Sequence, residues 1–472
     1  MSLRSISVFG LGRVGLVTAA CLASEGVQTV CFDTDDSVVS MVDRGESPFF
    51  EPRLSELVQR SVKAGLLRVT NDPREAVNES ELTIVTVGTP SDKDGTIDLT
   101  YVRSACRIIG QALAEKTGWH LVVIKSTVPP KTTETVIRPL IEQASAKRCP
   151  RGFGLCANPE FLREGNAVED TIKPDRIIIG QLDERSGDAL ESFYREFYRH
   201  PPPVLRTTAV NAELVKYANN AFLAVKVSFI NNVADVCQRI PTADIETVAR
   251  GIGLDNRIGK LFLNAGIGWG GSCLPKDVRA FSEFAKSLGT EIPVVDAALH
   301  TNEKQPVKVV QVAEKILGSL ESKLVALLGL SFKPGTDDMR NAVSVKIIEE
   351  LVRKGAKVVA YDPRAMANAR KILDGKIQIS PSAQDCINGA DCCIIVTEWD
   401  EFKTMQPGDF ISRMRKPLVI DGRRIFDADI FSREILYVGI GLGMKNQGHF
   451  RPSPANGYAA ETQQSRKGPK ND

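Results

Sequence analysis

Short apolar runs rich in β-branched residues alternate with amphipathic stretches in two separate parts of this chain of 472 residues. Buried strands of this kind, separated by helix-like stretches, are typical of parallel sheets with helices on both faces. In the first part the predicted strands are 6–9, 28–32, 82–87, 121–125, 154–157 and 176–180, and the predicted helices are 14–24, 54–64 and 99–115. This order predicts an α/β domain with a doubly wound parallel sheet.

A segment without strand signals or helix breakers follows, from residue 208 to residue 240, and Pro241 ends it. At the rise of an α-helix it spans about 45 Å, which is longer than a small domain needs. Its apolar residues recur at helical spacing, namely Leu214, Ala218, Ala221, Phe222, Val225, Phe229, Val233 and Val236. We therefore expect one long helix that serves as a hinge, a spacer or a homodimer interface.

The alternation returns after residue 318. Three further helices are predicted before this point, at 244–251, 275–286 and 293–317. After it, a helix is predicted at 343–355 and strands at 323–330, 357–361, 392–396 and 418–421. The segment VQTVCFD, which ends at Asp33, resembles AKVVAYD, which ends at Asp362. We therefore expect two doubly wound, Rossmann-like domains, 1–207 and 319–445, joined by a central helical domain, 208–318. Residues 446–472 lack a periodic apolar face, and a disordered tail is predicted there.

The bulk properties exclude several classes of protein. The net charge of +2 gives no basis for binding nucleic acid or an anionic membrane. No apolar run approaches the ~20 residues of a membrane-spanning helix, and the first residues read as a strand rather than a signal peptide. The ten cysteines show no zinc spacing and no C-x-x-C motif, so no metal site is expected. Together these features predict a soluble protein of the reducing cytoplasm.

A glycine-rich motif, Gly10-Leu11-Gly12-Arg13-Val14-Gly15, lies between the first predicted strand and the first predicted helix. In that context the glycines permit a tight turn and the close approach of a pyrophosphate, which the helix N-terminus then faces. Asp33 ends the next strand, where an acid accepts from the ribose hydroxyls of NAD and repels the 2′-phosphate of NADP. Arg13 partly offsets this repulsion, but Asp33 is expected to decide for NAD. The alternative is a glycine-rich turn with no ligand.

Two later strands also end in polar segments. Val87-Gly88-Thr89-Pro90 follows one of them, at the edge of the sheet where ligands gather, although these residues alone favour a simple strand-ending turn. Asn158-Pro159-Glu160-Phe161-Leu162-Arg163-Glu164-Gly165 follows another and places two acids four residues apart.

A second glycine-rich segment, residues 266–277, places Cys273 just before a predicted helix. The dipole of a helix favours the thiolate form of a thiol at its N-terminus, and Lys276 adds positive charge. The alternative is a structural Cys beside a flexible turn. On the long predicted helix, Lys216 and Asn220 are four residues apart and share one face. Both can donate to a developing oxyanion, or they form only a solvated polar face.

Seven motifs, in order, resemble the UDP-glucose/GDP-mannose dehydrogenase family over about residues 1–445. They are the dinucleotide loop, VGTPSDKDGTIDL, KSTVPP, NPEFLREG, AELVKYANNAFLAVKVSFINNVA, GGSCLPKD and GLSFKPGTDDMR. The chain departs from the family at Arg53 in FFEPRL, where Gly is common, and this departure concerns the local turn. The resemblance implies a soluble NAD-dependent enzyme that oxidises the C6 alcohol of a nucleotide-linked hexose to a carboxylate. It also implies a homodimer or a higher homo-oligomer.

The resemblance implies catalytic roles for several of the residues above. Cys273 is the nucleophile, and Lys216 and Asn220 hold the C6 oxygen through its anionic forms. Asp277 orients Lys216 and the hydrolytic water.

Further roles follow from the same resemblance. Thr127 in KST and Glu160 in NPEF handle water and protons. Residues that meet NAD are Gly10, Gly12, Arg13, Val14, Gly15, Asp33, Thr89, Pro90, Thr127, Glu164 and Arg340. Residues that meet the nucleotide sugar are Glu160, Phe161, Leu162, Lys216, Asn220, Arg257, Asn264, Gly270, Phe332, Lys333 and Arg423. Arg423 reaches the substrate across a dimer contact in this family.

The expected reaction explains why a cysteine is needed. Oxidising an alcohol to an acid removes four electrons, so two NAD must act in turn. The aldehyde formed first has no second transferable hydride until a nucleophile adds to it. Addition of the Cys273 thiolate gives a thiohemiacetal, the second oxidation gives a thioester, and water releases the acid. A simple alcohol dehydrogenase needs no such cysteine.

The motifs divide on the substrate. GGSC argues against the N-acetylmannosamine branch, in which the corresponding segment resembles GGHC. In contrast, LPKDVRA and QLDERSGD resemble segments of GDP-mannose dehydrogenases. GLDNRIGKLFLNAGIGWGGSC resembles the UDP-glucose branch more closely. We therefore expect UDP-glucose, with GDP-mannose or another nucleotide hexose as the alternative. A nucleotide-sugar-binding protein without turnover is the alternative from a different class, and the set of Cys, Lys, Asn and Asp residues argues against it.

Overall fold

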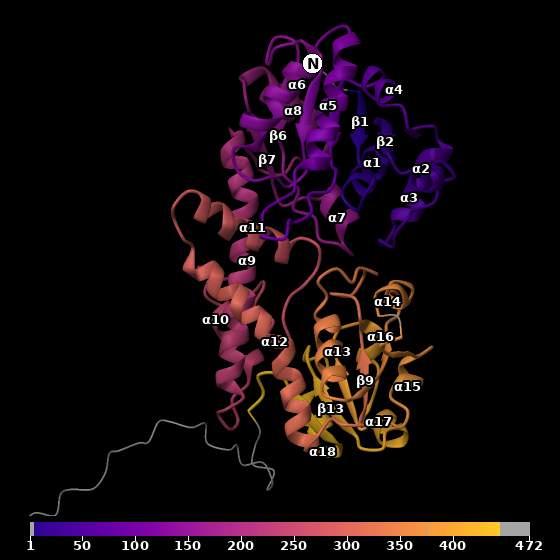
Figure 1. Ribbon diagram of the computed structural model, residues 1–472, viewed down its shortest axis with the longest axis vertical. Helices are drawn as coiled ribbons and strands as arrows, with labels where there is room; N and C mark the ends of the chain where they lie inside the picture. Colours follow the sequence, from indigo (N-terminus) through magenta and orange to yellow (C-terminus); the bar gives the residue numbers. More distant parts are fainter. Residues whose placement is uncertain (1–3, 374, 444–472) are drawn as a thin grey trace, which may run out of the picture.

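Eight strands form the first sheet of the computed structural model, which describes residues 4–373 and 375–443 (Figure 1). Their order across the sheet is β3-β2-β1-β4-β5-β6-β7-β8. The strands are β1 (Ser5–Phe9), β2 (Gln28–Phe32), β3 (Leu67–Thr70), β4 (Leu82–Val85), β5 (Leu121–Ile124), β6 (Gly154–Ala157), β7 (Ile177–Gln181) and β8 (Val204–Thr208). The direction of winding reverses between β1 and β4, and ligands of such sheets bind at the carboxyl ends of strands beside this point.

Helices cover both faces of this sheet, and a hydrophobic core lies on each face. They are α1 (Gly15–Ser24), α2 (Asp36–Asp43), α3 (Leu54–Lys63), α4 (Pro73–Asn78), α5 (Thr100–Glu115), α6 (Arg138–Ser145), α7 (Ala167–Ile172) and α8 (Glu184–Phe197), with a π-helical turn at Thr133–Ile137. Aspartate side chains cap several of them. Asp183, for example, accepts from the backbone N–H of Ser186 at 3.0 Å, which stabilises the first turn of α8.

The first sheet differs in two ways from the predicted one. Strands β3 and β8 were not predicted, because the short β3 has an irregular burial pattern and the edge strand β8 is only partly covered. Strand β7 pairs with β6 in the antiparallel direction, so the sheet is not parallel throughout. Between these two strands the chain forms only a loop and the short α7, and β7 therefore starts at the edge where β6 ends.

One long helix, α9 (Ala209–Cys237), begins directly after β8 of the first sheet and extends to the side of the second sheet domain (Figure 1). Its 29 residues span about 44 Å at the rise of an α-helix. Thr208 caps it by accepting from the backbone N–H of Asn211. The helix ends at Cys237 rather than at Ile240, because two tight turns precede Pro241 and the residue before a proline disfavours helix.

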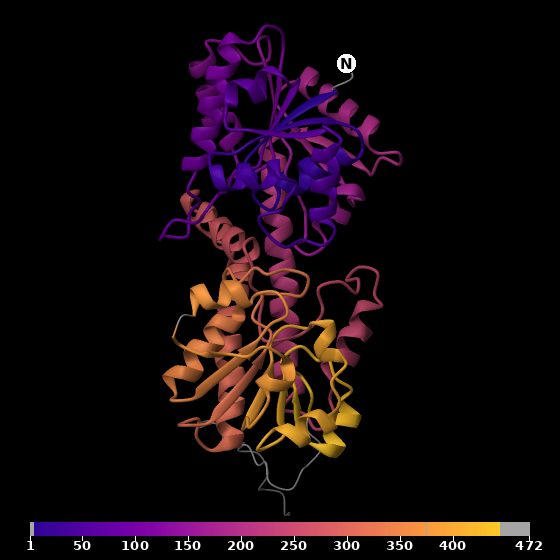
Figure 2. The same cartoon turned by 90° about the vertical axis from the view of Figure 1, so that its right-hand side faces the viewer.

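Three helices complete the central domain: α10 (Ile245–Gly253), α11 (Leu274–Ser287) and α12 (Pro293–Leu317). Helices α11 and α12 both pack against α9, with Ala221, Ala224, Trp269, Val278 and Val295 in the shared core. Viewed from the side, the two sheet domains lie one above the other and the helical domain connects them (Figure 2). No helix among residues 4–373 and 375–443 is long and apolar enough to cross a membrane.

The second sheet is parallel throughout, with the order β11-β10-β9-β12-β13-β14. Its strands are β9 (Leu324–Leu328), β10 (Lys357–Tyr361), β11 (Gln378–Ile379), β12 (Cys392–Ile395), β13 (Leu418–Asp421) and β14 (Leu436–Gly439). Its helices are α13 (Val343–Arg353), α14 (Met366–Ile372), α15 (Ala383–Cys386), α16 (Asp400–Lys403), α17 (Pro407–Arg413) and α18 (Ala428–Glu434). The predicted fold class, two Rossmann-like domains joined by a helical one, is thus confirmed. The tail predicted at 446–472 lies outside the described residues.

Arg53, the departure from the family motif, occupies a position that suits glycine. Its φ of 68° lies in the left-handed region, where a side chain costs about 1 kcal/mol. Its guanidinium lies 3.3 Å from a carboxylate oxygen of Glu169, on the exposed surface. The turn therefore forms with Arg53 in it, at a small cost in backbone strain.

Candidate active site

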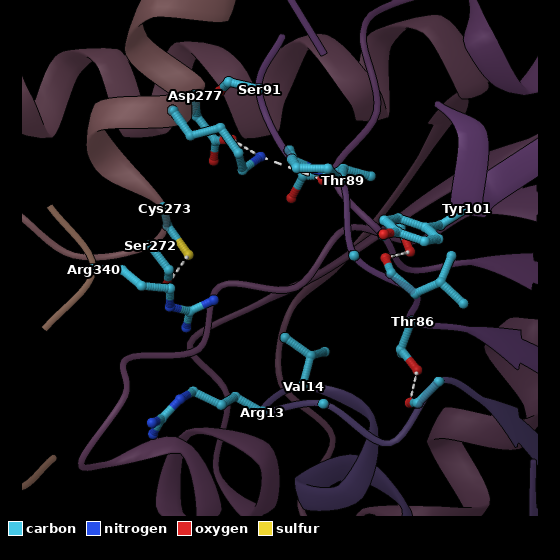
Figure 3. Close-up of a pocket in the computed structure, with 18 of the residues that line it drawn as sticks. Arg13, Val14, Thr86, Thr89, Ser91, Tyr101, Ser272, Cys273, Asp277 and Arg340 are labelled. Carbon is cyan, nitrogen blue, oxygen red and sulfur yellow. Dashed lines mark hydrogen bonds and ion pairs between the residues drawn. The ribbon is translucent and has the colours of Figure 1, made fainter. Parts of the chain in front are cut away.

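A cavity of about 1220 Å³ opens at the carboxyl edge of the first sheet, beside the point where the winding reverses. The loops after β1, β2, β4, β5 and β6 line it from one side, and α11 and the loop after β9 line it from the other. Figure 3 shows Cys273, Ser272 and Arg340 on one side of this cavity, and Thr86 and Tyr101 on the opposite side. The cavity is therefore shared by the first domain, the central domain and the second sheet domain.

The glycines of the first loop have different roles. A Cβ at Gly15 would lie 2.5 Å from Thr86 Oγ1 and closer still to the carbonyl oxygen of Gly10, so packing inside the protein requires glycine there. Gly10 has a φ of 96°, which also requires glycine. A Cβ at Gly12 would meet nothing within 4 Å, although Gly12 lines the cavity. The protein itself does not need glycine at this position, whereas a bound pyrophosphate that approaches the backbone does.

Asp33 lies directly after β2 and lines the cavity. Its Oδ2 accepts from the backbone N–H of Leu11 at 2.6 Å, and its Oδ1 accepts from the backbone N–H of Asp35 at 3.0 Å. These two bonds hold the carboxylate beside the first loop. Each oxygen retains a lone pair that can accept from a ribose hydroxyl.

Arg13 lines the same cavity as Asp33, but its guanidinium is bound to other groups. Its guanidinium donates to Asp337 Oδ1 at 2.6 Å and to Thr336 Oγ1 at 3.2 Å, both in the second sheet domain. The Phe49 ring lies 5.0 Å from it. Arg13 is thus engaged in a contact between the two sheet domains, which makes its guanidinium less available to a 2′-phosphate beside Asp33.

Cys273 caps the N-terminus of α11, and its sulfur faces the cavity (Figure 3). The surroundings of the sulfur do not favour the expected thiolate form. Burial raises the pKa of the Cys273 thiol to about 11, and the charges of Glu160 and Asp277 act in the same direction, although Lys216 opposes them. Lys276 does not help, because its ammonium donates to Asp277 at 2.5 Å and to Thr89 at 3.3 Å.

Two buried polar pairs lie beside Cys273. Asn220 Nδ2 donates to Asp277 Oδ2 at 2.7 Å, and Asp277 is 1% exposed. Lys216 Nζ donates to the backbone carbonyl of Glu160 at 2.7 Å and to its Oε1 at 3.1 Å. Burial would lower the pKa of Lys216, but the charges of Glu160, Asp277 and Cys273 outweigh it and raise this pKa. The long helix therefore places a stable cation and an amide next to Glu160 and Asp277, which line the cavity, although Lys216 and Asn220 are themselves buried and are not among the residues that line it.

Other expected residues also line the cavity. Thr127 follows β5, and Leu162 follows β6; Val14, Thr89 and Pro90 line the cavity as well.

Glu164 and Arg340 lie beside Cys273. Glu164 Oε1 accepts from Ser272 Oγ at 2.6 Å, and Arg340 Nη2 lies 3.4 Å from the same oxygen. Burial raises the pKa of Glu164, as does the Asp338 charge, whereas Ser272, Arg13 and Arg340 lower it. This carboxyl therefore lies between the thiol and the contact between the two sheet domains.

The second glycine-rich loop owes its glycines mainly to protein contacts. A Cβ at Gly271 would lie 2.7 Å from the ring of Phe332, and a Cβ at Gly270 would clash with the carbonyl oxygen of Asn341. The loop is therefore pressed against the loop after β9, and ligand approach is not needed to explain these two glycines. Lys333 lies beside it, where burial lowers its pKa and the charges of Glu164 and Glu51 oppose the change.

Some expected substrate residues do not reach the cavity within this chain. Arg257 is exposed and pairs with Asp255, and Asn264 is exposed as well. Arg423 donates to the carbonyls of Val396 at 2.8 Å and Gly268 at 3.1 Å. Phe161 is partly buried, with Arg176 stacked 3.8 Å from its ring. The roles of these residues toward the nucleotide sugar therefore stay predictions.

Sequence reasoning missed several cavity residues, and Lys125 is the most notable of them. Lys125 stands two residues before Thr127 in KST, at a strand end, which is a signal that could have been used. Ser272, beside Cys273 in GGSCLPKD, and Tyr101 also line the cavity, and neither was assigned a role.

Three family models match the chain in succession. The NAD binding domain of the UDP-glucose/GDP-mannose dehydrogenase family matches residues 4–198, its central domain matches residues 210–304, and its UDP binding domain matches residues 326–428. These matches follow the order of the two sheet domains and the helical domain between them.

Individual proteins agree with these models. A UDP-glucose 6-dehydrogenase of Haloferax volcanii is 42% identical over 422 residues, which are 89% of this chain and 96% of that protein. One of Bacillus subtilis is 40% identical over 427 residues, which are 90% of each chain. The structure of a UDP-glucose dehydrogenase from Pyrobaculum islandicum has a TM-score of 0.87 and 39% identity, and the match covers 93% of this chain and 98% of the other.

Proposed function

Because this chain belongs to the UDP-glucose/GDP-mannose dehydrogenase family, we propose that it oxidises C6 of UDP-glucose to the carboxylate of UDP-glucuronate, with NAD as oxidant. One observation carries the proposal. A single cavity contains both a dinucleotide loop and the thiol of Cys273. Two buried pairs, Lys216 with Glu160 and Asn220 with Asp277, adjoin that thiol.

The residues around the first loop fit NAD. The open space over Gly12 admits a pyrophosphate, and the carboxylate of Asp33 accepts from ribose hydroxyls. We propose that Val14, Thr89 and Pro90 complete this site, because all three line the same cavity. NAD supplies the oxidising power, and two molecules of it are used in turn because the reaction removes four electrons. The protein side chains supply the remaining chemistry.

In the first oxidation the C6 hydroxyl gives up its proton to water and C6 gives up a hydride to the oxidant, so the C6 oxygen carries negative charge as the C=O bond forms. Lys216 and Asn220 are proposed to donate to that oxygen. Lys216 stays cationic because neighbouring charges raise its pKa. Within residues 4–373 and 375–443 its ammonium donates to two oxygens of Glu160 and lies 5.3 Å from the Phe161 ring, and its third proton is proposed to meet the substrate oxygen. A fixed cation at the developing charge is usually the largest single contribution to such a step.

Cys273 is proposed to add to the aldehyde as a thiol that gives up its proton during the reaction. With a pKa of about 11 it is protonated near neutrality. As the bond from Sγ to C6 forms, the C6=O π bond breaks, and the thiol proton ends on the C6 oxygen. The resulting thiohemiacetal carries the C–H that the second oxidation needs, and that oxidation leaves a thioester.

Water then releases the acid. The bond from the water oxygen to C6 forms, and the bond from C6 to Sγ breaks, so that the thiolate leaves. We propose that the carboxylate of Glu160 accepts the proton of the water, and that Thr127 and Asp277 orient the water by hydrogen bonds. All three line the cavity, and burial of Glu160 and Asp277 keeps bulk water away from them.

The substrate is proposed to be a UDP-hexose held partly by the second sheet domain. The match of residues 326–428 to a UDP binding domain supports the uridine nucleotide over the guanosine nucleotide. The identity of about 40% to two UDP-glucose 6-dehydrogenases supports glucose as the hexose. In this proposal Phe161, Lys333 and the loop 264–270 bind the nucleotide sugar.

We further propose that two chains associate along α9. Leu214, Phe222, Phe229 and Val236 lie at helical spacing on this helix and are 39%, 65%, 56% and 56% exposed. Such a stripe of large apolar side chains is typical of an interface. Arg423 is proposed to reach the substrate of the partner subunit in this dimer.

The domain boundaries and the compartment are also proposals. We place the boundaries at 207/208 and 318/319, where α9 begins and where α12 has ended. All ten cysteines are free thiols, which suits the reducing cytoplasm.

A panel of nucleotide sugars tests the proposed function. The protein is incubated with NAD and either UDP-glucose, UDP-N-acetylmannosamine or GDP-mannose, and the NADH formed is measured. UDP-glucose is expected to give the highest kcat/KM. A higher kcat/KM with GDP-mannose would identify GDP-mannose as the substrate in place of UDP-glucose. Binding of UDP-glucose without NADH formation would point to a binding protein without turnover.

A further inference from the structure

Lys125 and Asn158 connect two neighbouring strand ends at the cavity. Lys125 follows β5 and lines the cavity, and Asn158 follows β6 and is 2% exposed. Lys125 Nζ donates to Asn158 Oδ1 at 2.9 Å. Strands β5 and β6 are parallel, with Ile124 opposite Ala157. The hydrogen bond therefore joins equivalent positions on the two strands.

Two residues of the proposed hydrolytic step follow this pair in the sequence, each at a spacing of two residues. Thr127 lies two residues after Lys125, and Glu160 lies two residues after Asn158. Both line the cavity. A bond that fixes the first residue after each strand restricts the path of both loops, and so restricts the separation of Thr127 and Glu160.

A third group contacts the same amide. The hydroxyl of Tyr194, on α8, donates to Asn158 Oδ1 at 2.5 Å, and its ring lies 6.0 Å from Lys125 Nζ. Asn158 Nδ2 donates to the carbonyl of Ile178 at 2.8 Å, on β7. Asn158 is therefore held by Lys125, by Tyr194 and by β7. Its backbone N–H also donates to the carbonyl of Ile124 at 2.8 Å, so the Lys125 side chain adds a second link between the two strand ends, on the cavity side.

Charged groups face Lys125 from two further elements. Glu160, after β6, raises its pKa, and Lys216, on α9, lowers it. Burial is the largest influence and brings the pKa of Lys125 down to about 8. Lys125 is thus a second basic group beside Glu160, in addition to Lys216.

We propose that Lys125 is a positioning residue for hydrolysis of the thioester, because its hydrogen bond to Asn158 holds Thr127 and Glu160 at the separation that the attacking water needs. This inference rests on the proposed function, in which Glu160 accepts the proton of the water and Thr127 orients that water. The groups proposed for the two oxidations, Cys273, Lys216 and Asn220, come from α9 and the start of α11 instead. Loss of Lys125 therefore affects hydrolysis more than the oxidations.

The test compares Lys125→Met with Tyr194→Phe as the matched control. Tyr194→Phe removes a donor to the same amide and a weak acceptor 3.5 Å from Lys125 Nζ, but it leaves the bond from Lys125 to Asn158. Each variant is mixed rapidly with NAD and UDP-glucose, NADH is followed, and the mass of the intact protein is measured during turnover. Lys125→Met is expected to release up to two NADH per site in a burst and then turn over at least about tenfold more slowly than wild type. An acyl-enzyme should accumulate in this variant above its level in the wild type and in Tyr194→Phe.

Each outcome decides between the explanations. A merely structural role would slow NADH formation in both oxidations and leave no added acyl-enzyme, and this result would overturn the inference, as would turnover at the wild-type rate. If Lys125→Met does not fold, Asn158→Ser removes the acceptor of the same hydrogen bond, and the same accumulation is expected. Failure of the wild type to form acid from UDP-glucose would instead refute the proposed function.

Discussion

Two glycines of the dinucleotide loop should respond to alanine in opposite ways. A Cβ at Gly15 would lie 2.5 Å from Thr86 Oγ1 and nearer still to the carbonyl oxygen of Gly10. Overpacking of this kind typically destabilises a fold by about 1–3 kcal/mol. The bond from Thr86 Oγ1 to the Gly10 carbonyl, 2.8 Å long, lies in the same place, and its loss adds about 1 kcal/mol. Gly15→Ala should therefore destabilise the first domain by about 2–4 kcal/mol.

Gly12→Ala should leave the stability unchanged and weaken NAD binding. The new methyl group meets nothing within 4 Å in the protein, so the free energy of unfolding should change by less than about 0.5 kcal/mol. It occupies the side of the loop that a pyrophosphate must approach. A clash costing about 1.4–2.8 kcal/mol raises the Kd for NAD about 10- to 100-fold.

Thermal unfolding without cofactor and titration with NAD separate the two effects. For a domain of this size, Gly15→Ala should lower the apparent Tm by about 5–15 °C. Gly408→Ala serves as a control, because its Cβ also meets nothing within 4 Å and Gly408 is not among the residues that line the cavity. The reasoning is refuted if Gly12→Ala lowers the Tm as much as Gly15→Ala does, or binds NAD with wild-type affinity.

Three further outcomes follow from the structure. Because Arg13 is bonded to Asp337 of the second sheet domain, Asp33 should decide the choice of cofactor, and kcat/KM should favour NAD over NADP by at least about tenfold; comparable values would contradict this. The double variant Phe222→Glu and Phe229→Glu should be monomeric in sedimentation velocity at micromolar concentration, where the wild type should be a dimer, and a monomeric wild type would count against the interface. Burial raises the pKa of Glu213 from 4.5 to about 7, so this group stabilises the fold fully below pH 4.5 and loses that contribution, about 3 kcal/mol, as the pH rises through 7. Between pH 5 and pH 8 the apparent Tm of Glu213→Gln should therefore fall less than that of the wild type. Parallel curves of apparent Tm against pH for the two proteins would contradict the assignment.

The sequence predicts those elements whose signals are local. The strands β2, β10 and β13 and the helix α12 have the predicted bounds, because continuous apolar runs or proline and glycine mark their ends. Strand β8 is an edge strand with polar residues, so it lacks such a run. The antiparallel direction of β7 depends on how the preceding loop packs, which no local pattern encodes.

The candidate site shows the same division. The spacing within each motif indicates a turn or a shared helix face, and the cavity does gather Gly12, Asp33, Thr127, Glu160 and Cys273. The electrostatics, however, depend on residues far apart in the chain.

Two examples show this dependence. The pKa of Cys273 is raised by burial and by Glu160, and a dipole argument from one helix end cannot include either influence. Arg13 finds its partner Asp337 in another domain, and this contact exists only in the folded chain.

The account depends most directly on Cys273. Its variant Cys273→Ala should bind UDP-glucose and NAD as the wild type does, because binding is proposed to come from other residues. The wild type should form two NADH for each UDP-glucuronate. The decisive measurement is the rate of UDP-glucuronate formation by Cys273→Ala, which should fall by at least about a thousandfold because no covalent adduct can form. Acid formation by this variant at a rate near that of the wild type would contradict the central claim.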